Sequence, residues 1–242
     1  MKVCWISAGV SSFIAGWLVR DTIDKWIYID VEDQHPDSMR FIHDCEKEVG
    51  KIEIIRSEKY KNVEDVARKC GIINTPHGAA CTGMLKKAVR KKWENEQYQK
   101  GITDLCYVWG MDAKEKRRKD SIEKNFPEFT HEFPLIDRNL SKEDCHAILE
   151  RLGIKRPLMY DLGYSNNNCI GCVKGGMGYW NKIRKDFPEV FDARAKLERD
   201  IGGSCINGVY LDELDPEAGR MSMEIMEDCS IMCYLAINEK EG

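Results

Sequence analysis

Short apolar runs alternate along this chain with stretches of helical periodicity, and this pattern limits the folds that the chain can adopt. Residues 3–6 form the first apolar run, and apolar side chains then recur with helical spacing from residue 13 to residue 23. A second apolar run follows at residues 26–29. Two strands joined by a helix are expected to lie parallel, because a parallel pair requires a long crossover connection.

The same alternation continues along the chain. The next elements that we predict are helices at 37–49, 62–70 and 82–96 and strands at 52–55 and 105–109. Ser141 is expected to be the N-cap of a further helix that ends near residue 152. The pattern predicts an α/β fold with a doubly wound, mainly parallel sheet.

The C-terminal part differs in composition. Residues 160–178 are rich in Gly and Asn, which is typical of a functional loop, and large apolar residues between 180 and 197 predict a helical C-terminal cap. The chain has 242 residues, 43% of them hydrophobic, which is enough for one large core. We therefore expect an α/β domain at residues 1–157, with residues 158–242 forming a loop, cap and tail packed on the same domain.

Charge and hydropathy narrow the functional classes. The 37 basic and 41 acidic residues leave a formal net charge of only -4, so no global field attracts the protein to a polyanion. The uncharged segment 3–19 is interrupted by Ser and Gly and is short for a bilayer span. We expect a cytoplasmic protein without membrane association.

A turn of small residues joins the first strand to the first helix, with the sequence Ser7-Ala8-Gly9-Val10-Ser11-Ser12. A helix that begins directly after a strand directs N–H groups outward, and these attract an anion. Small side chains would let a phosphate group approach the backbone. The turn lacks the Gly-Lys-Ser/Thr ending of a Walker A loop, and a plain tight turn would have a similar composition.

The turn resembles the S-G-G-x-D-S PP-loop of the adenine nucleotide α-hydrolase superfamily. This superfamily includes the reductases of phosphoadenosine phosphosulfate (PAPS) and adenosine phosphosulfate (APS), and tRNA thiolation enzymes. Ala8 stands in place of a glycine and Ser11 in place of the aspartate. The resemblance implies a Rossmann-like PP-loop domain that binds PAPS, APS or ATP through Ser7, Ala8, Gly9, Ser11 and Ser12.

Later runs extend the resemblance over most of the chain. Residues 28–37 resemble the second-strand motif of the reductases, which lies beside the nucleotide, and residues 157–164 resemble a run that ends in L-Y-D-x-G-Y. The segment 164–176 is similar to a signature of PAPS reductase-like proteins from phages and mobile elements. By this resemblance, the nucleotide is also expected to contact Asp30, Lys86 and Gly110.

The chain contains 11 cysteines, and a soluble domain of this size does not depend on disulfides. Cys169 and Cys172 form a C-x-x-C pair, a spacing that allows two thiolates to bind one metal. By itself the pair is compatible with a zinc half-site, a redox pair or chance. The segment around Cys81 resembles the region of APS reductases in which cysteines join a later C-x-x-C to bind a [4Fe-4S] cluster. The resemblance implies cluster ligands at Cys81, Cys169 and Cys172. A four-cysteine cluster needs one more ligand, and we expect Cys233 in that place, with zinc as the alternative metal.

Another cysteine near the C-terminus has two interpretations. The run Asp228-Cys229-Ser230-Ile231 resembles the E-C-G-I/L segment whose cysteine attacks the sulfonucleotide sulfur in the reductases. A thiolate close to positive charge is a competent nucleophile. Cys229 is thus the expected catalytic residue, and a role as cluster ligand stays open for it.

Two runs of basic residues, at 86–92 and 114–119, are either solvated helix faces or phosphate contacts. The leading hypothesis is an enzyme that uses an iron–sulfur cluster and a thiol electron donor to reduce a sulfonucleotide. One alternative is ATP-dependent iron–sulfur thiolation of a nucleic acid. The other is a non-enzymatic nucleotide-binding module with a structural metal. A homodimer is compatible with each of the three.

Overall fold

The structure is a computed structural model that describes residues 1–75 and 78–224, and the chain divides into two compact units. The first unit contains residues 1–30, 35–56 and 89–167, and the second contains 31–34, 57–88 and the chain from 168 onward. The sequence suggests a boundary at residue 157, whereas residues 158–167 group with the first unit.

Five strands form the sheet of the first unit, in the order β3-β2-β1-β6-β7, and every neighbouring pair is parallel. The strands are β1 (Lys2–Ile6), β2 (Lys25–Ile29), β3 (Glu53–Ile55), β6 (Cys106–Val108) and β7 (Thr130–Glu132). Cys4 in β1 pairs with Trp26 on one side and with Val108 on the other. The predicted doubly wound, parallel α/β fold is confirmed.

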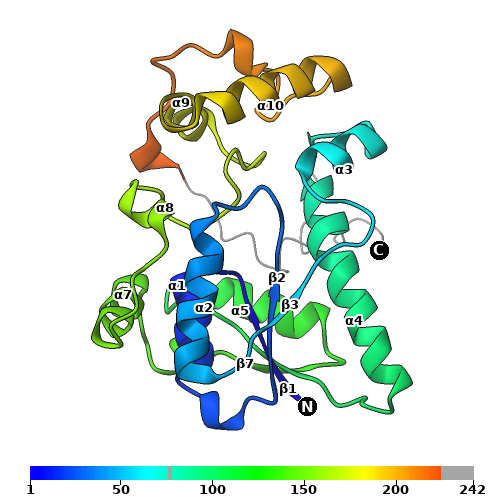
Figure 1. Cartoon of the computed structure of the whole chain (residues 1–242), viewed down its shortest axis with the longest axis vertical. Coiled ribbons are helices and arrows are strands. Elements are labelled where there is room, and N and C mark those ends of the chain that lie inside the picture. The colour runs from blue at the N-terminus through cyan, green and yellow to red at the C-terminus, as the bar shows by residue number, and fades with distance from the viewer. Residues whose placement is uncertain (76–77, 225–242) are drawn as a thin grey trace. The chain divides into compact units, whose positions relative to one another are not determined.

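Helices cover both faces of this sheet (Figure 1). They are α1 (Val10–Trp17), α2 (Asp37–Val49), α4 (Ala88–Gln99), α5 (Lys116–Asn125), α6 (Pro134–Asp137), α7 (Lys142–Arg151) and α8 (Leu158–Asp161). Alternate residues of a strand point to opposite faces. Cys4 joins an apolar cluster with Phe13 and Phe41, whereas Trp5 packs edge-on against Trp93 of α4, with ring centroids 5.3 Å apart. Burial on both faces explains why β1 is a continuous apolar run in the sequence.

The strand order reverses direction at the boundary between β1 and β6. Strands β2 and β3 extend the sheet on one side of β1, and β6 and β7 extend it on the other. In open α/β sheets, ligands bind at such a reversal, outside the carboxyl ends of the strands. The turn that follows β1 lies at this edge.

Local sequence signals define several helix ends. Ser141 caps α7 and forms a capping box with Asp144, as its sequence context predicts. Asn62 caps α3 (Val63–Cys70) by accepting a hydrogen bond from the N–H of Asp65. The helix expected at 82–96 is divided into a π-helical turn, η2 (Thr82–Lys87), and α4. Such π-turns are rare and have no sequence signature.

The second unit contains α3, α9 (Met177–Asp186), α10 (Pro188–Ile201) and the antiparallel pair β4 (Asn74–Thr75) and β5 (Gly78–Ala79). Helices α9 and α10 pack through Trp180 and Phe191, whose ring centroids are 6.3 Å apart. These are the predicted C-terminal helices. Two short 3-10 turns of the described chain, η3 (Leu211–Glu213) and η4 (Met221–Met223), belong to the second unit, and a third, η1 (Arg20–Thr22), belongs to the first. Over the described ranges, no helix combines the length and the apolar character needed to cross a membrane.

Candidate functional site

The turn between β1 and α1 contains a residue with an unusual backbone. Ala8 has a φ of 58°, in the left-handed region that favours glycine, and Gly9 follows as the extended N-cap of α1. For an alanine this conformation costs about 1–2 kcal/mol. The PP-loop that this turn resembles has a glycine at this position. Glycine adopts the left-handed conformation without strain, which explains why that residue is suited to the position.

Serine hydroxyls close the turn on itself. The Oγ of Ser12 donates to the carbonyl oxygen of Gly9 at 2.9 Å and accepts from the N–H of Ser7 at 3.1 Å. The Oγ atoms of Ser7 and Ser12 are 3.0 Å apart, and the N–H of Gly9 donates to Ser7 Oγ at 3.3 Å. These hydrogen bonds link the two ends of the turn, Ser7 and Ser12, to each other.

The start of α1 presents backbone donors. The N–H of Val10 donates to the hydroxyl of Tyr160 at 3.3 Å. Within the part of the chain that the structure describes, no protein group accepts from the N–H groups of Ser11 and Ser12. Donors at a helix N-terminus, together with the helix dipole, stabilise an anion. This part of the site can hold a phosphate or sulfate group.

Ser11 directs its side chain into the protein. It is 5% exposed, and its hydroxyl forms a hydrogen bond with the thiol of Cys145 on α7. Burial raises the pKa of Cys145 to about 12, and the Ser11 hydrogen bond acts in the opposite direction. The residue that replaces the aspartate of the PP-loop therefore contributes to packing between α1 and α7.

Gly110 brings the end of β6 against the turn. A Cβ atom at this position would lie 2.7 Å from the backbone nitrogen of Ser12, so only glycine fits. The preceding Trp109 is fixed by a hydrogen bond from its Nε1 to the Nδ1 of His131, at 3.0 Å. Gly110, which the resemblance assigns to the nucleotide, thus also determines how closely β6 approaches the turn.

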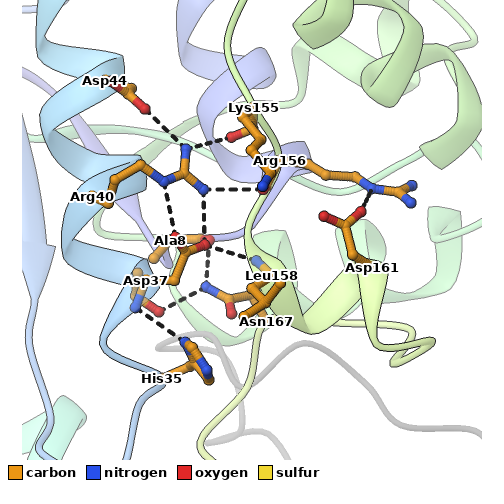
Figure 2. A network of polar contacts seen from close by, with 11 residues as sticks. Ala8, His35, Asp37, Arg40, Asp44, Lys155, Arg156, Leu158, Asp161 and Asn167 are labelled. Carbon is orange, nitrogen blue, oxygen red and sulfur yellow. Dashed lines mark hydrogen bonds and ion pairs between the residues drawn. The ribbon is translucent and has the colours of Figure 1, made fainter.

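Two residues from the chain after α7 complete the surroundings of the turn. Tyr160 binds the N–H of Val10, and the Nδ2 of Asn167 donates to the carbonyl oxygen of Ala8 at 2.8 Å and to the Oγ of Ser38 at 2.9 Å. Figure 2 shows Asn167 and Ala8 side by side. Sequence reasoning did not single out Tyr160 or Asn167, although both lie in runs that carry the family resemblance.

A polar network around Asp37 fixes the start of α2 (Figure 2). Its carboxylate accepts from Arg40 at 2.8 Å and from the N–H of Leu158 at 2.8 Å. Arg40 also donates to the carbonyl oxygens of Lys155 and Arg156. The hydrogen bond from Arg40 lowers the pKa of Asp37, so the carboxylate stays ionised well into the acid range. The network holds the segment that contains Tyr160 to α2.

Asp30 follows β2, the strand beside β1. Its carboxylate forms an ion pair with Arg56 at 2.6 Å and accepts from the hydroxyl of Tyr28 at 3.3 Å. The carboxylate that the sequence predicts to contact a nucleotide is therefore already paired with Arg56.

A cavity of about 850 Å³ lies against α7, and no residue of the 7–12 turn lines it. His146 is in its wall and packs edge-on against Tyr160, with ring centroids 4.8 Å apart. Burial, with the nearby Arg156 and Lys142, lowers the pKa of His146. The cavity is not lined by the turn, and His146 in its wall contacts Tyr160, which accepts from the N–H of Val10.

The cysteine loop is in the second unit. Cys169 and Cys172 are both 7% exposed, and the hydroxyl of Tyr179 joins them. It accepts from the N–H of Cys172 at 2.9 Å and donates to the carbonyl oxygen of Cys169 at 3.2 Å. Ile170 between them donates its N–H to the carbonyl oxygen of Asp33 at 2.8 Å. The C-x-x-C is thus a closed, buried turn.

The predicted metal ligands lie only partly within the described residues. Within the described ranges, no group of three or more His, Cys, Asp or Glu side chains could hold a metal ion. Cys81 directly precedes η2. Lys86 lies within η2 and is 8% exposed. Both residues belong to the second unit. Cys229 and Cys233 lie outside the described residues. The four-cysteine ligand set therefore stays a prediction.

The N-terminus of α9, directly after the cysteine loop, is filled by a carboxylate of the chain itself. Glu224 accepts from the N–H groups of Gly176 at 3.1 Å, Gly178 at 2.8 Å and Tyr179 at 3.4 Å. A side chain at Gly178 would clash with the backbone of Arg220 at 2.5 Å. The glycines allow residues 220–224 to lie directly on the helix end.

The basic runs are partly used within the protein. Arg90 is 2% exposed and pairs with the carboxylate of Glu94 at 3.1 Å, which in turn accepts from Tyr107 at 2.6 Å. In the second run, Arg118 pairs with Glu115. Arg90 is thus a buried member of an ion pair, and Arg118 is a partly exposed one.

No protein-family model matches the chain, and no curated protein sequence matches it. Among solved structures, the chain is similar to phosphoadenylyl-sulfate (PAPS) reductase from Candida auris in its phosphate complex. The TM-score is 0.48 at 14% sequence identity, and the match covers 69% of this chain and 80% of that one.

Proposed function

We propose that the chain binds an adenine nucleotide at the turn after β1 and is an enzyme of the PAPS reductase type that acts on a sulfonucleotide. The observation that carries the proposal is the set of N–H donors at the start of α1, placed where the strand order reverses. Phosphate binds at such helix ends because several donors and the helix dipole act on the same anion.

Ser11 supports a sulfonucleotide rather than ATP as the substrate. The PP-loop aspartate is missing, and the serine in its place is turned toward Cys145. The phosphate-binding backbone remains without a carboxylate in the first turn of α1. This arrangement suits a reaction in which the nucleotide is bound through phosphate and ATP is not cleaved.

In the proposed reaction, the thiolate of Cys229 attacks the sulfur of PAPS or APS. The bond between that sulfur and the phosphate oxygen breaks, and the nucleotide leaves with the bonding electrons. A thiol electron donor then attacks the Cys229 sulfur, which forms a disulfide and releases sulfite. Two thiols are oxidised and the transferred sulfur gains two electrons. The role of Cys229 rests on the resemblance of its segment.

We also propose that Cys81, Cys169, Cys172 and Cys233 hold a [4Fe-4S] cluster, with zinc as the alternative. The support is the buried C-x-x-C turn closed by Tyr179. Such clusters are bound by cysteine thiolates. No step of the reaction is assigned to the metal.

Calorimetric titration with PAPS, APS and ATP tests nucleotide binding. The intact chain is expected to bind PAPS or APS, and Gly9→Val should abolish binding because the new side chain occupies the space where phosphate meets the backbone. Gly203→Val is the control, since a Cβ at position 203 has only Ile201 near it, at 3.9 Å. Equal affinity in the Gly9→Val variant would remove the turn from the site.

Product analysis separates the enzymatic hypotheses. Sulfite formation from PAPS or APS with a thiol donor supports the reductase. ATP cleavage that depends on a nucleic acid would support thiolation instead. Tight binding without turnover of any substrate would identify a non-enzymatic nucleotide-binding module.

Anaerobic purification tests the metal. A [4Fe-4S] protein is expected to be brown, with absorbance near about 400 nm, whereas a zinc protein is colourless. Iron and zinc analysis of the same sample distinguishes the two metals, and the absence of both would overturn the metal proposal.

A further inference from the structure

The left-handed residue in the phosphate-binding turn has a dedicated partner. Ala8 is fully buried with a φ of 58°, and a residue with a Cβ atom does not adopt this conformation without an opposing interaction. Asn167, which lies outside the turn, donates a hydrogen bond to the carbonyl oxygen of Ala8. The hydrogen bond fixes the orientation of the peptide group that joins Ala8 to Gly9.

The orientation of the Asn167 amide follows from chemistry. The carbonyl oxygen of Ala8 can only accept, so the NH₂ end of the side chain must face it. The same nitrogen donates its second hydrogen to Ser38. Asn167 is 4% exposed, and its Oδ1 has no hydrogen-bond partner among the described residues.

This arrangement contributes little net stability. A buried acceptor without a partner loses its hydration, and that loss offsets the gain from the hydrogen bonds at the other end of the amide. Asn181 in the second unit has the same pattern, with Nδ2 bound to the carbonyl oxygens of Asp215 and Ala218 and an unpaired Oδ1. The two asparagines differ in what they hold, because only Asn167 binds a left-handed residue of the turn.

We propose that Asn167 is a positioning residue: its amide holds Ala8 in the left-handed conformation and so keeps the phosphate-binding donors of α1 in place before the ligand arrives. The inference rests on the proposed nucleotide-binding function. Asn167 itself needs no contact with the ligand. Its contribution is pre-organisation, which raises affinity by removing the cost of ordering the turn on binding.

The test is a double-mutant cycle with Asn167→Ala and Ala8→Gly in the full chain, with adenosine 3′,5′-bisphosphate as the calorimetric probe. Asn167→Ala should weaken binding about tenfold, equivalent to about 1.4 kcal/mol. Ala8→Gly provides the second background of the cycle, because glycine adopts the left-handed conformation without strain, and its own affinity is the reference for that background. In the Ala8→Gly background, Asn167→Ala should cost less than about threefold.

Asn181→Ala is the matched control, because it removes the same kind of buried amide at a position away from the turn. The affinity of this variant for the probe should stay within about twofold of the wild-type affinity. If Asn167→Ala does not fold by circular dichroism, the isosteric Asn167→Asp takes its place, with a loss of at least about tenfold expected because both donors are removed. Wild-type affinity in the folded variant, or a loss that Ala8→Gly does not rescue, would overturn the inference alone. A wild-type chain that fails to bind the probe would overturn the proposed function as well.

Discussion

The N-termini of α1 and α9 are built alike and are used differently. Each follows a run of small residues, and each directs N–H groups away from the helix. At α9 three of these donors are taken by the carboxylate of Glu224. At α1 the partners are neutral hydroxyl groups, and the N–H groups of Ser11 and Ser12 have no acceptor among the described residues.

The difference lies in the acceptors of the N–H groups. A carboxylate at a helix N-terminus satisfies the donors and the dipole, so α9 has its anion within the chain. At α1 the described hydrogen-bond partners of the N–H groups of Gly9 and Val10 are neutral hydroxyls, so an external anion would not have to displace a carboxylate of the chain there. Small residues before a helix therefore do not by themselves define a ligand site. The start of a helix is open to a ligand only where its N–H groups have no acceptor within the chain.

The largest expected effect concerns the cysteine loop beside α9. Cys169→Ser and Cys172→Ser should each lower the iron content to about a tenth or less, because a serine hydroxyl is a poor replacement for a thiolate ligand. Cys81→Ser should behave in the same way. Cys70→Ser is the control, and retention of full iron in all three variants would contradict the ligand assignment.

Gly110→Ala should be the most damaging single change at the α1 end. The added methyl group would meet the backbone of Ser12, so we expect a loss of about 3 kcal/mol in the free energy of unfolding and loss of nucleotide affinity. Chemical denaturation and calorimetry measure the two effects. A variant with wild-type stability would show that β6 does not press on the turn.

Asp37→Asn should lower the free energy of unfolding by about 2 kcal/mol at neutral pH, because Arg40 loses a charged partner. The pKa of Asp37 is lower in the folded state than in the unfolded chain. The contribution of Asp37 to the free energy of unfolding is therefore complete above the titration range of an unfolded aspartate, near about pH 4. This contribution disappears as the pH falls through the lower pKa of the folded state. Denaturation curves of variant and wild type should therefore converge in strong acid. A constant difference at all pH values would exclude the ionic origin, and Asp21→Asn serves as the exposed control.

Glu224→Gln should cost about 1 kcal/mol, since the amide oxygen still accepts but the charge at the helix N-terminus is lost. The loss should shrink at high salt, which screens the charge. Glu217→Gln, at an exposed position, should have no measurable effect. Equal stability of the Glu224 variant and the wild type would mean that α9 does not need its internal anion.

The smallest expected effect on stability is that of Ala8→Gly. Relief of the left-handed strain is offset by the greater freedom of glycine in the unfolded chain and by the loss of a buried methyl group, so the net change should be within about 0.5 kcal/mol. Thermal melts resolve a change of this size. Destabilisation beyond about 2 kcal/mol would mean that the methyl group, not the backbone, dominates at this position.

Much of the fold was predictable because its central strands are buried on both faces. Their apolar runs mark β1, β2 and β6 in the sequence, and the capping box at Ser141 marks the start of α7. The strand β7 was missed, because its three residues, Thr-His-Glu, have no apolar pattern at the edge of the sheet. The mostly polar helix α5 was missed for the same reason.

The candidate site was only partly predictable. The turn 7–12 follows from its place at the first strand-to-helix junction, whereas Tyr160 and Asn167 meet it across about 150 residues of chain. Contacts of this kind depend on the tertiary fold and leave no local pattern. The left-handed conformation of Ala8 was also hidden, since alanine has no preference for it.

The central claim is that the start of α1 takes an external anion and the start of α9 does not. The most direct measurement is an NMR titration of the ¹⁵N-labelled full chain with adenosine 3′,5′-bisphosphate. We expect saturating shifts of the backbone amide signals of Ser11 and Ser12, with the signals of Gly176, Gly178 and Tyr179 unchanged. Shifts confined to the residues bound by Glu224, with none in the turn after β1, would contradict this claim.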